Sequence, residues 1–161
     1  SKAFNMTGWR LAFVVGNPLV VKAFAAVKDN NDSGQFNAIQ LAGKYALEHP
    51  EITEATAAKY SRRHGMLVDT LTKLGFAVKK PKASFYLYFR VPKGIKGGQR
   101  FATGEDFSQY LLREKLISTV PWDDVEPCVR MSVTFVAKDE ADEQRVMEEI
   151  YRRLSDVEFE F

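Results

Sequence analysis

The feature that most constrains the fold of this 161-residue sequence is the alternation of helical and extended patterns after Pro50. A helical repeat over residues 53–74 precedes an aromatic and β-branched run at 84–91, which is typical of a strand. A helix beginning near Thr103, strands at 117–120 and 129–135, and a helix at 139–154 complete the pattern. This order predicts an α/β layer, a short sheet with helices packed on it.

Capping residues in the sequence predict where several helices begin. Thr103 and Asp106 have the spacing of a capping box, with aspartate in place of glutamate. Asn17 followed by Pro18 is a typical helix start, and this helix is predicted to run to Lys28. Asp32 or Ser33 is expected to cap a second helix, which carries an apolar stripe and ends before residue 50.

The first ten residues carry two cations and no acidic partner, with Lys2 near the start and Arg10 eight positions later. The short apolar run at 11–16 is bounded by glycine and is predicted to be a buried strand. A free ammonium at the edge of such a core is costly unless it has an anionic or covalent partner.

Residues 2–12 resemble the cofactor-lysine segment of the class I/II aminotransferases, which are pyridoxal-phosphate enzymes of fold type I. In that family a lysine is followed eight positions later by the arginine of a Gly-x-Arg step, matched here by Lys2, Gly8 and Arg10. The resemblance implies that Lys2 is the catalytic lysine, bound covalently to pyridoxal 5'-phosphate. It also implies that Arg10 binds the cofactor phosphate, for which a guanidinium is well suited.

Arg130 is the third candidate, because it interrupts an alternating apolar strand pattern. Residues 128–132 resemble the family segment whose arginine binds the α-carboxylate of the substrate. The alternative is a solvent-facing arginine on an edge strand. Tyr86 and Tyr88 are predicted to pack on the sheet. Trp122 is predicted to lie in an acidic loop, and the alternative is that it lies at the edge of the substrate pocket.

The resemblance covers the whole chain as the C-terminal part of a fold type I enzyme. It implies that residues 1–48 are a remnant of the large cofactor-binding domain and that residues 49–161 form the small C-terminal α/β domain. We therefore expect a fragment, inactive alone, of a homodimeric aminotransferase that acts on an amino acid and a 2-oxo acid. Segments 32–40 and 117–124 are most similar to the LL-diaminopimelate aminotransferases of lysine biosynthesis, and aspartate- or aromatic-type enzymes are the next candidates.

Composition and residue spacing limit the partners, the cellular location and the metal sites that this chain can have. The net charge of +2 is too small to require nucleic acid or an anionic membrane as a partner, and no apolar run reaches 18 residues. The single cysteine, Cys128, favours a reducing, cytoplasmic location. His49 and His64 lack metal-ligand spacing. The alternative function is nucleic-acid binding by segment 79–100, where seven basic residues and no acidic one flank an aromatic strand.

Overall fold

The computed structural model describes residues 2–161; Ser1, the small residue before the predicted cofactor lysine, lies outside the described residues. The chain divides into two compact units, of which unit 1 ends at Ala58 and unit 2 is Lys59–Phe161. This division falls within helix α3 (Glu51–Lys73), whereas the predicted boundary at 48–49 coincides with the end of helix α2 (Asn37–Glu48). Among the described residues no helix is both long and apolar enough to cross a membrane.

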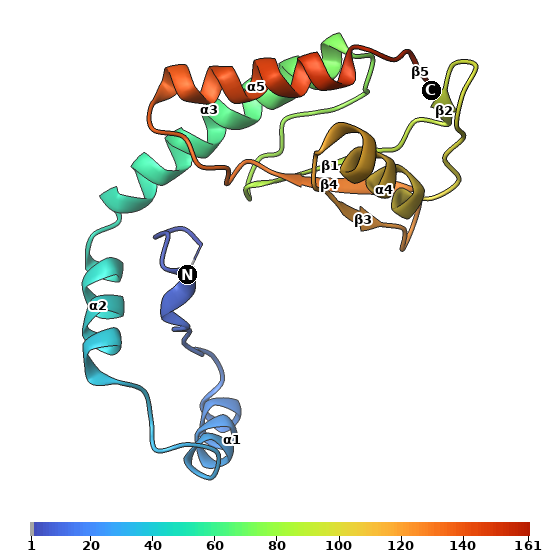
Figure 1. Ribbon diagram of the computed structural model, residues 1–161. Coiled ribbons are helices and arrows are strands. Elements are labelled where there is room, and N and C mark those ends of the chain that lie inside the picture. Colours follow the sequence, from blue (N-terminus) through green and yellow to red (C-terminus); the bar gives the residue numbers. More distant parts are fainter. Residues whose placement is uncertain (1) are drawn as a thin grey trace. The chain divides into compact units, whose positions relative to one another are not determined.

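Unit 1 is helical (Figure 1). A short 3₁₀ turn, η1 (Thr7–Trp9), is followed by α1 (Pro18–Asp29), α2 and the first turns of α3. The start of α1 is as predicted, because the Asn17 side chain accepts a hydrogen bond from the Leu19 amide at 2.9 Å and Pro18 occupies the first turn.

Two predictions for unit 1 are wrong. Residues 11–16 form no strand, and Val15 is 80% exposed, because a strand needs a second strand beside it and no strand of the described residues pairs with this run. Helix α2 begins at Asn37, with Phe36 in the N-cap position. Asp32 instead accepts a hydrogen bond from the Gly34 amide within its own turn.

Unit 2 contains a three-stranded antiparallel sheet in the order β1-β4-β3 and a two-stranded antiparallel pair, β2-β5. The strands are β1 (Tyr86–Arg90), β2 (Gly94–Ile95), β3 (Val120–Trp122), β4 (Cys128–Ser132) and β5 (Phe159–Glu160). Helices α4 (Gly104–Lys115) and α5 (Glu140–Leu154) complete the unit with the rest of α3, and α3 and α5 lie side by side (Figure 1). The predicted α/β class, a short sheet with packed helices, is confirmed.

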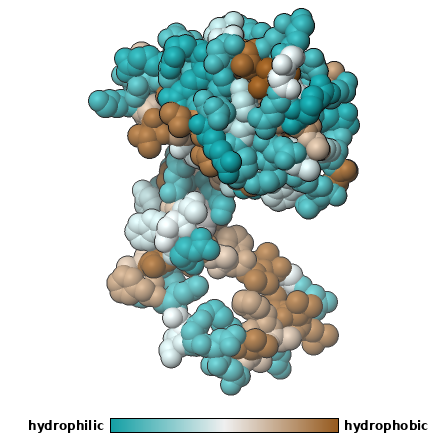
Figure 2. Space-filling model, turned by 45° about the vertical axis from the view of Figure 1, so that its right-hand side comes forward, coloured by the Kyte–Doolittle hydropathy of each residue, from teal (hydrophilic) through white to brown (hydrophobic). Residues whose placement is uncertain are grey.

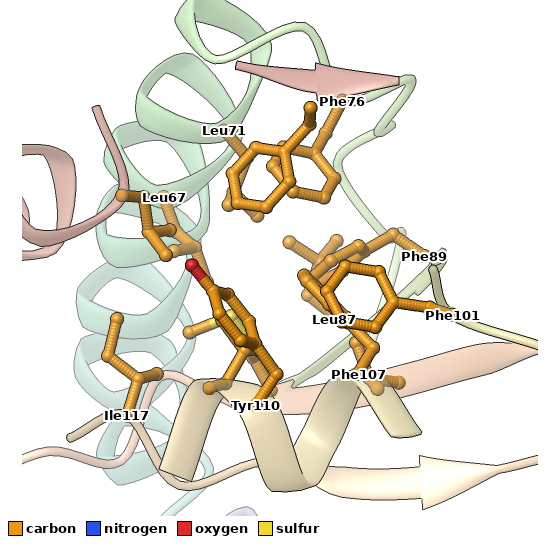
Figure 3. Packing of buried hydrophobic residues seen from close by; sticks show 14 of the residues in the cluster. Leu67, Leu71, Phe76, Leu87, Phe89, Phe101, Phe107, Tyr110 and Ile117 are labelled. Carbon is orange, nitrogen blue, oxygen red and sulfur yellow. The ribbon is translucent and has the colours of Figure 1, made fainter. Parts of the chain in front are cut away.

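One face of the three-stranded sheet is buried in the core. Leu87 and Phe89 of β1 alternate with exposed or half-buried neighbours, as do Val129 and Met131 of β4. These side chains pack with Leu67 of α3 and with residues of α4 and α5 (Figure 3). The opposite face of the sheet is left for polar and aromatic side chains.

The predicted ends of unit 2 elements are partly correct. The capping box of α4 is present, with the Thr103 hydroxyl accepting from the Asp106 amide at 3.0 Å. The strand predicted at 117–120 begins only at Val120 and runs through Pro121, which an edge strand tolerates because one side needs no amide donor. The strand predicted at 129–135 ends at Ser132, where pairing with β1 ends.

A buried ionic cluster joins α3 to α5. The side chains of Arg63 and Glu143 are 2% and 4% exposed, and Arg63 Nε donates to Glu143 Oε1 at 2.8 Å. Arg63 Nη1 also donates to the carbonyl oxygens of Val133 and Phe135, at 3.0 and 2.7 Å. Arg62 Nε donates to the second oxygen of Glu143 at 2.9 Å. The pKa of the Glu143 carboxyl is therefore lowered, chiefly by its hydrogen bond with Arg62.

Candidate functional site

Lys2 and Arg10 lie on one segment folded into two consecutive turns in unit 1. The Lys2 carbonyl accepts from the Asn5 amide at 3.1 Å, and the Met6 carbonyl accepts from the Trp9 amide at 3.2 Å. Asn5 and Arg10 have φ of 54° and 53°, a left-handed conformation uncommon for residues other than glycine. Such backbone strain tends to gather at functional sites.

The two cations of this segment are exposed and available to a ligand. Among residues 2–161, neither Lys2 nor Arg10 forms an ion pair, and one guanidinium nitrogen of Arg10, Nη1, donates to the Thr7 carbonyl at 3.2 Å. A guanidinium has five N–H donors, so most of those on Arg10 have no protein acceptor in the described part of the chain. The segment therefore presents a primary amine and a guanidinium without a neutralising carboxylate.

The same segment contacts α2. Residues of the stretch 4–13, Gln35 and residues of α2, both apolar and polar, line a groove of about 590 Å³, and neither Lys2 nor Arg10 is among the lining residues. A Cβ added at Gly43 of α2 would lie 2.2 Å from Leu11 Cδ2, so glycine at this position allows Leu11 to approach the helix closely. Unit 1 also exposes many large apolar side chains, which gather as brown patches in Figure 2.

Arg130 lies at the centre of the solvent-side face of the three-stranded sheet in unit 2. It is half-buried, and it pairs in register with Tyr88 of β1 and with Val120 of β3. Its guanidinium carbon lies 4.2 Å from the centroid of the Tyr86 ring and 5.3 Å from that of Trp122. Arg130 is thus on the central strand, so the edge-strand part of the alternative is wrong, although its side chain lies on the solvent-side face.

The lack of an anionic partner in the described chain distinguishes Arg130 from Arg90, the other arginine of the sheet. Within residues 2–161 it has neither an ion pair nor a hydrogen-bond acceptor, whereas the exposed Arg90 of the same face pairs with Glu126. A half-buried cation without a counter-ion is unfavourable unless an anion reaches it. The arrangement is suited to binding a carboxylate from solution.

Three of the seven basic residues in segment 79–100, one of them Arg90 with Glu126, form ion pairs among the described residues. Lys96 pairs with Glu158 at 3.0 Å, Arg100 pairs with Glu160, and Lys93 Nζ donates to the Phe161 carbonyl at 2.8 Å. These contacts tie the segment to the C-terminal strand and reduce the positive charge that nucleic-acid binding would use.

Sequence reasoning assigned Tyr86 and Tyr88 to sheet packing and placed Trp122 beside the substrate pocket only as an alternative to an acidic loop. Tyr86 and Tyr88 do pack on the sheet, but on its outer face, and Trp122 belongs to β3 rather than to the predicted loop. The alternation of Tyr86, Tyr88 and Arg90 with apolar residues was the available signal, because it places all three on the face opposite the core.

Comparison with known proteins identifies the family of this chain. The family described as aminotransferase class I and II matches residues 1–150. The chain belongs to the class I and II aminotransferases. Solved aminotransferase-fold structures are similar too: the substrate-bound BacF structure from Bacillus subtilis has a TM-score of 0.83 at 30% identity, with 99% of this chain and 39% of that chain covered. An aromatic aminotransferase from Pyrococcus horikoshii has a TM-score of 0.79 at 27% identity, covering 97% of this chain and 41% of that chain.

Two relatives in this aminotransferase family are LL-diaminopimelate aminotransferases. Those of Methanococcus maripaludis and Methanocaldococcus jannaschii are each 55% identical to this chain, over 100% of its length and 40% of their own. The chain therefore spans about two-fifths of the length of the curated relatives it matches. The predicted family resemblance is confirmed, including its LL-diaminopimelate branch.

Proposed function

We propose that the whole protein containing this chain is a pyridoxal-phosphate-dependent LL-diaminopimelate aminotransferase, which transfers an amino group to a 2-oxo acid. We assign cofactor binding to Lys2 and Arg10, and binding of the substrate carboxylate to Arg130. The observation that carries the proposal is the half-buried guanidinium of Arg130, which has no anionic partner among the described residues. The substrate comes from the two relatives at 55% identity. A homodimer in the cytoplasm, as in the sequence-based prediction, belongs to the same proposal.

The residues present fit the cofactor. A primary amine can bond to an aldehyde, and a guanidinium binds phosphate through parallel N–H donors. Lys2 and Arg10 supply these two groups from one segment, exposed and without a carboxylate partner in the described chain. Pyridoxal phosphate, when bound, supplies an electron sink for the carbanion chemistry of transamination.

Lys2, Arg10 and Arg130 would have separate roles in binding and proton transfer. Lys2 Nζ would hold the cofactor, and its amine would accept the proton from the substrate Cα as a general base. Arg10 binds the phosphate oxygens and fixes the cofactor's position. Arg130 binds the α-carboxylate and so orients the Cα–H bond for proton removal.

The test is transamination by the whole protein, with LL-diaminopimelate and 2-oxoglutarate as substrates and glutamate as the measured product. We expect turnover, and we expect Lys2→Ala to reduce kcat by about 10²-fold or more, as for loss of a general base. Lys22→Ala, which removes an exposed lysine of α1, is the matched control and should retain activity. Turnover with aspartate or aromatic amino acids but not with LL-diaminopimelate would refute the substrate assignment.

A further test separates the role of Arg10 from that of Lys2. Arg10→Ala should weaken cofactor binding, measured by equilibrium dialysis, while Arg10→Lys should restore part of it, because lysine keeps the charge but not the bidentate geometry. Unchanged cofactor affinity in Arg10→Ala would contradict the phosphate assignment.

A further inference from the structure

The outer face of the three-stranded sheet surrounds Arg130 with aromatic rings on two strands. Tyr86 and Tyr88 come from β1 on one side of β4, and Trp122 comes from β3 on the other. The rings of Tyr88 and Trp122 meet edge to face, with their centroids 5.6 Å apart. Because β4 is the central strand, the guanidinium lies between groups that the sheet register fixes on both sides.

The distances of 4.2 Å to Tyr86 and 5.3 Å to Trp122 are within the range of cation–π contact. Contacts with ring faces leave the N–H edges of a guanidinium free, and none of the Arg130 donors has an acceptor among residues 2–161. The aromatic contacts thus hold the cation without occupying the donors that would bind an anion.

We call Tyr86 and Trp122, the two rings that contact the Arg130 guanidinium, the aromatic clamp. The strand end that carries Trp122 is held against helix α4. The neighbouring Asp123 accepts hydrogen bonds from the amides of Gly104 and Glu105, at 2.5 and 3.2 Å, and so caps the N-terminus of α4. A Cβ at Gly104 would lie 2.1 Å from the Cys128 carbonyl oxygen, so the helix end fits closely against β4 as well. The loop after Trp122 is therefore fixed to the core rather than free.

We propose that Tyr86 and Trp122 are positioning residues for substrate binding. They hold the Arg130 guanidinium in one orientation, so that its free edge binds the substrate α-carboxylate through two parallel hydrogen bonds. The inference rests on the proposed role of Arg130. Its physical basis is preorganisation, because an arginine side chain that is already ordered loses less conformational entropy when the carboxylate binds.

The first test uses the whole enzyme and measures the dissociation constant of 2-oxoglutarate together with KM and kcat. Tyr86→Leu and Trp122→Leu should each raise the dissociation constant and KM about 3- to 10-fold, as loss of a cation–π contact predicts, with little change in kcat. Tyr86→Phe and Trp122→Phe keep a ring and should restore most of the affinity. Tyr151→Leu, which removes an aromatic residue of α5 that is 42% exposed like Trp122, is the matched control and should change neither constant.

The outcomes separate this inference from the proposed function. If Arg130→Lys weakens 2-oxoglutarate binding but the two leucine variants bind like the parent, the clamp is refuted and the carboxylate role of Arg130 stands. If Arg130→Lys leaves binding unchanged, the proposed role of Arg130 fails and the clamp fails with it.

A second test needs no catalysis and uses the 161-residue chain. The sequence has two tryptophans, so a Trp9→Phe background leaves Trp122 as the reporter of fluorescence. Arg130→Met in that background should shift the Trp122 emission, with the far-UV circular dichroism unchanged. Identical emission spectra would overturn the stacked arrangement.

Discussion

Replacing Glu143 with glutamine should strongly destabilise unit 2. Glutamine keeps the size of the side chain but removes the negative charge that faces Arg63, whose side chain is 2% exposed. Arg63 then remains buried with its charge uncompensated, because its other acceptors are two backbone carbonyls. Breaking a buried ion pair by removing one partner costs about 3–5 kcal/mol in the free energy of unfolding.

The matched control is Glu140→Gln. Glu140 also pairs with Arg62, at 3.1 Å, but its side chain is 74% exposed. An exposed pair contributes about 0–1 kcal/mol, so this variant should unfold almost like the parent. The two substitutions have the same chemistry on one helix and differ in burial.

The assay is urea unfolding of the 161-residue chain, followed by circular dichroism. Glu143→Gln should lower the midpoint at an unchanged m-value, and a loss of 3 kcal/mol corresponds to about 12 °C or more in Tm for a domain of about 100 residues. Equal unfolding free energies for the two variants would refute the assignment of the buried pair.

The dependence of the unfolding free energy on pH, in the acid range, is a second test of the Arg63–Glu143 pair. The folded-state pKa of Glu143 is lowered from 4.5, first by the Arg62 hydrogen bond. The unfolded chain therefore binds this proton more readily, so the stabilisation is full above about pH 4.5 and is lost as the pH falls through the folded-state pKa. Glu143→Gln should remove this part of the acid-induced loss of stability.

Three further outcomes are expected. Gly104→Ala should destabilise the chain by more than about 2 kcal/mol, because the added Cβ would clash with the Cys128 carbonyl oxygen. Gly65→Ala, at a position in α3 where the Cβ meets no other atom, should stabilise the chain by about 0.5–1 kcal/mol. A higher urea midpoint for Gly104→Ala than for Gly65→Ala would contradict this. Burial lowers the pKa of His64 below 6.5, so the unfolded chain binds more protons below that pH and stability should fall from pH 6.5 toward the folded-state pKa; an equally steep fall in His64→Gln would exclude His64 as the cause. Asp139→Ala should cost about 1 kcal/mol by uncapping α5, and no change in midpoint would contradict the cap.

Helix ends that are set by capping residues close together in the chain could be predicted from the sequence. Asn17 before Pro18, and Thr103 three residues before Asp106, satisfy helix amides locally and need no tertiary partner. Gly75, which follows the last turn of α3 with a φ of 90°, is a helix-ending glycine of the same local kind. Lys2, Arg10 and Arg130 were named through the family resemblance, which rests on short local segments, and their roles stay predictions.

Features that depend on distant partners could not be predicted in the same way. The apolar run at 11–16 has the composition of a strand, but a strand exists only where another strand pairs with it. The Arg63–Glu143 pair joins residues 80 positions apart. A signal for it was present, because Arg63 lies four positions before Leu67 on the apolar face of α3, where an arginine needs a buried partner.

The neighbours of Arg130 depend on sheet order. Alternation placed Tyr86 on the outer face of its strand, but only the order β1-β4-β3 brings it and Trp122 to opposite sides of Arg130. The local residue pattern does not determine which strands of a short antiparallel sheet are neighbours. The contacts of Tyr86 and Trp122 with Arg130 could therefore be found only from the structure.

The measurement that tests the central claim most directly is the identity of the lysine that holds the cofactor. The whole protein would be loaded with pyridoxal phosphate, reduced with borohydride to fix the bond between the lysine amine and the aldehyde carbon, digested and mapped by mass spectrometry. The account predicts that the modified peptide contains Lys2. Modification of another lysine, with Lys2 recovered unmodified, would contradict it.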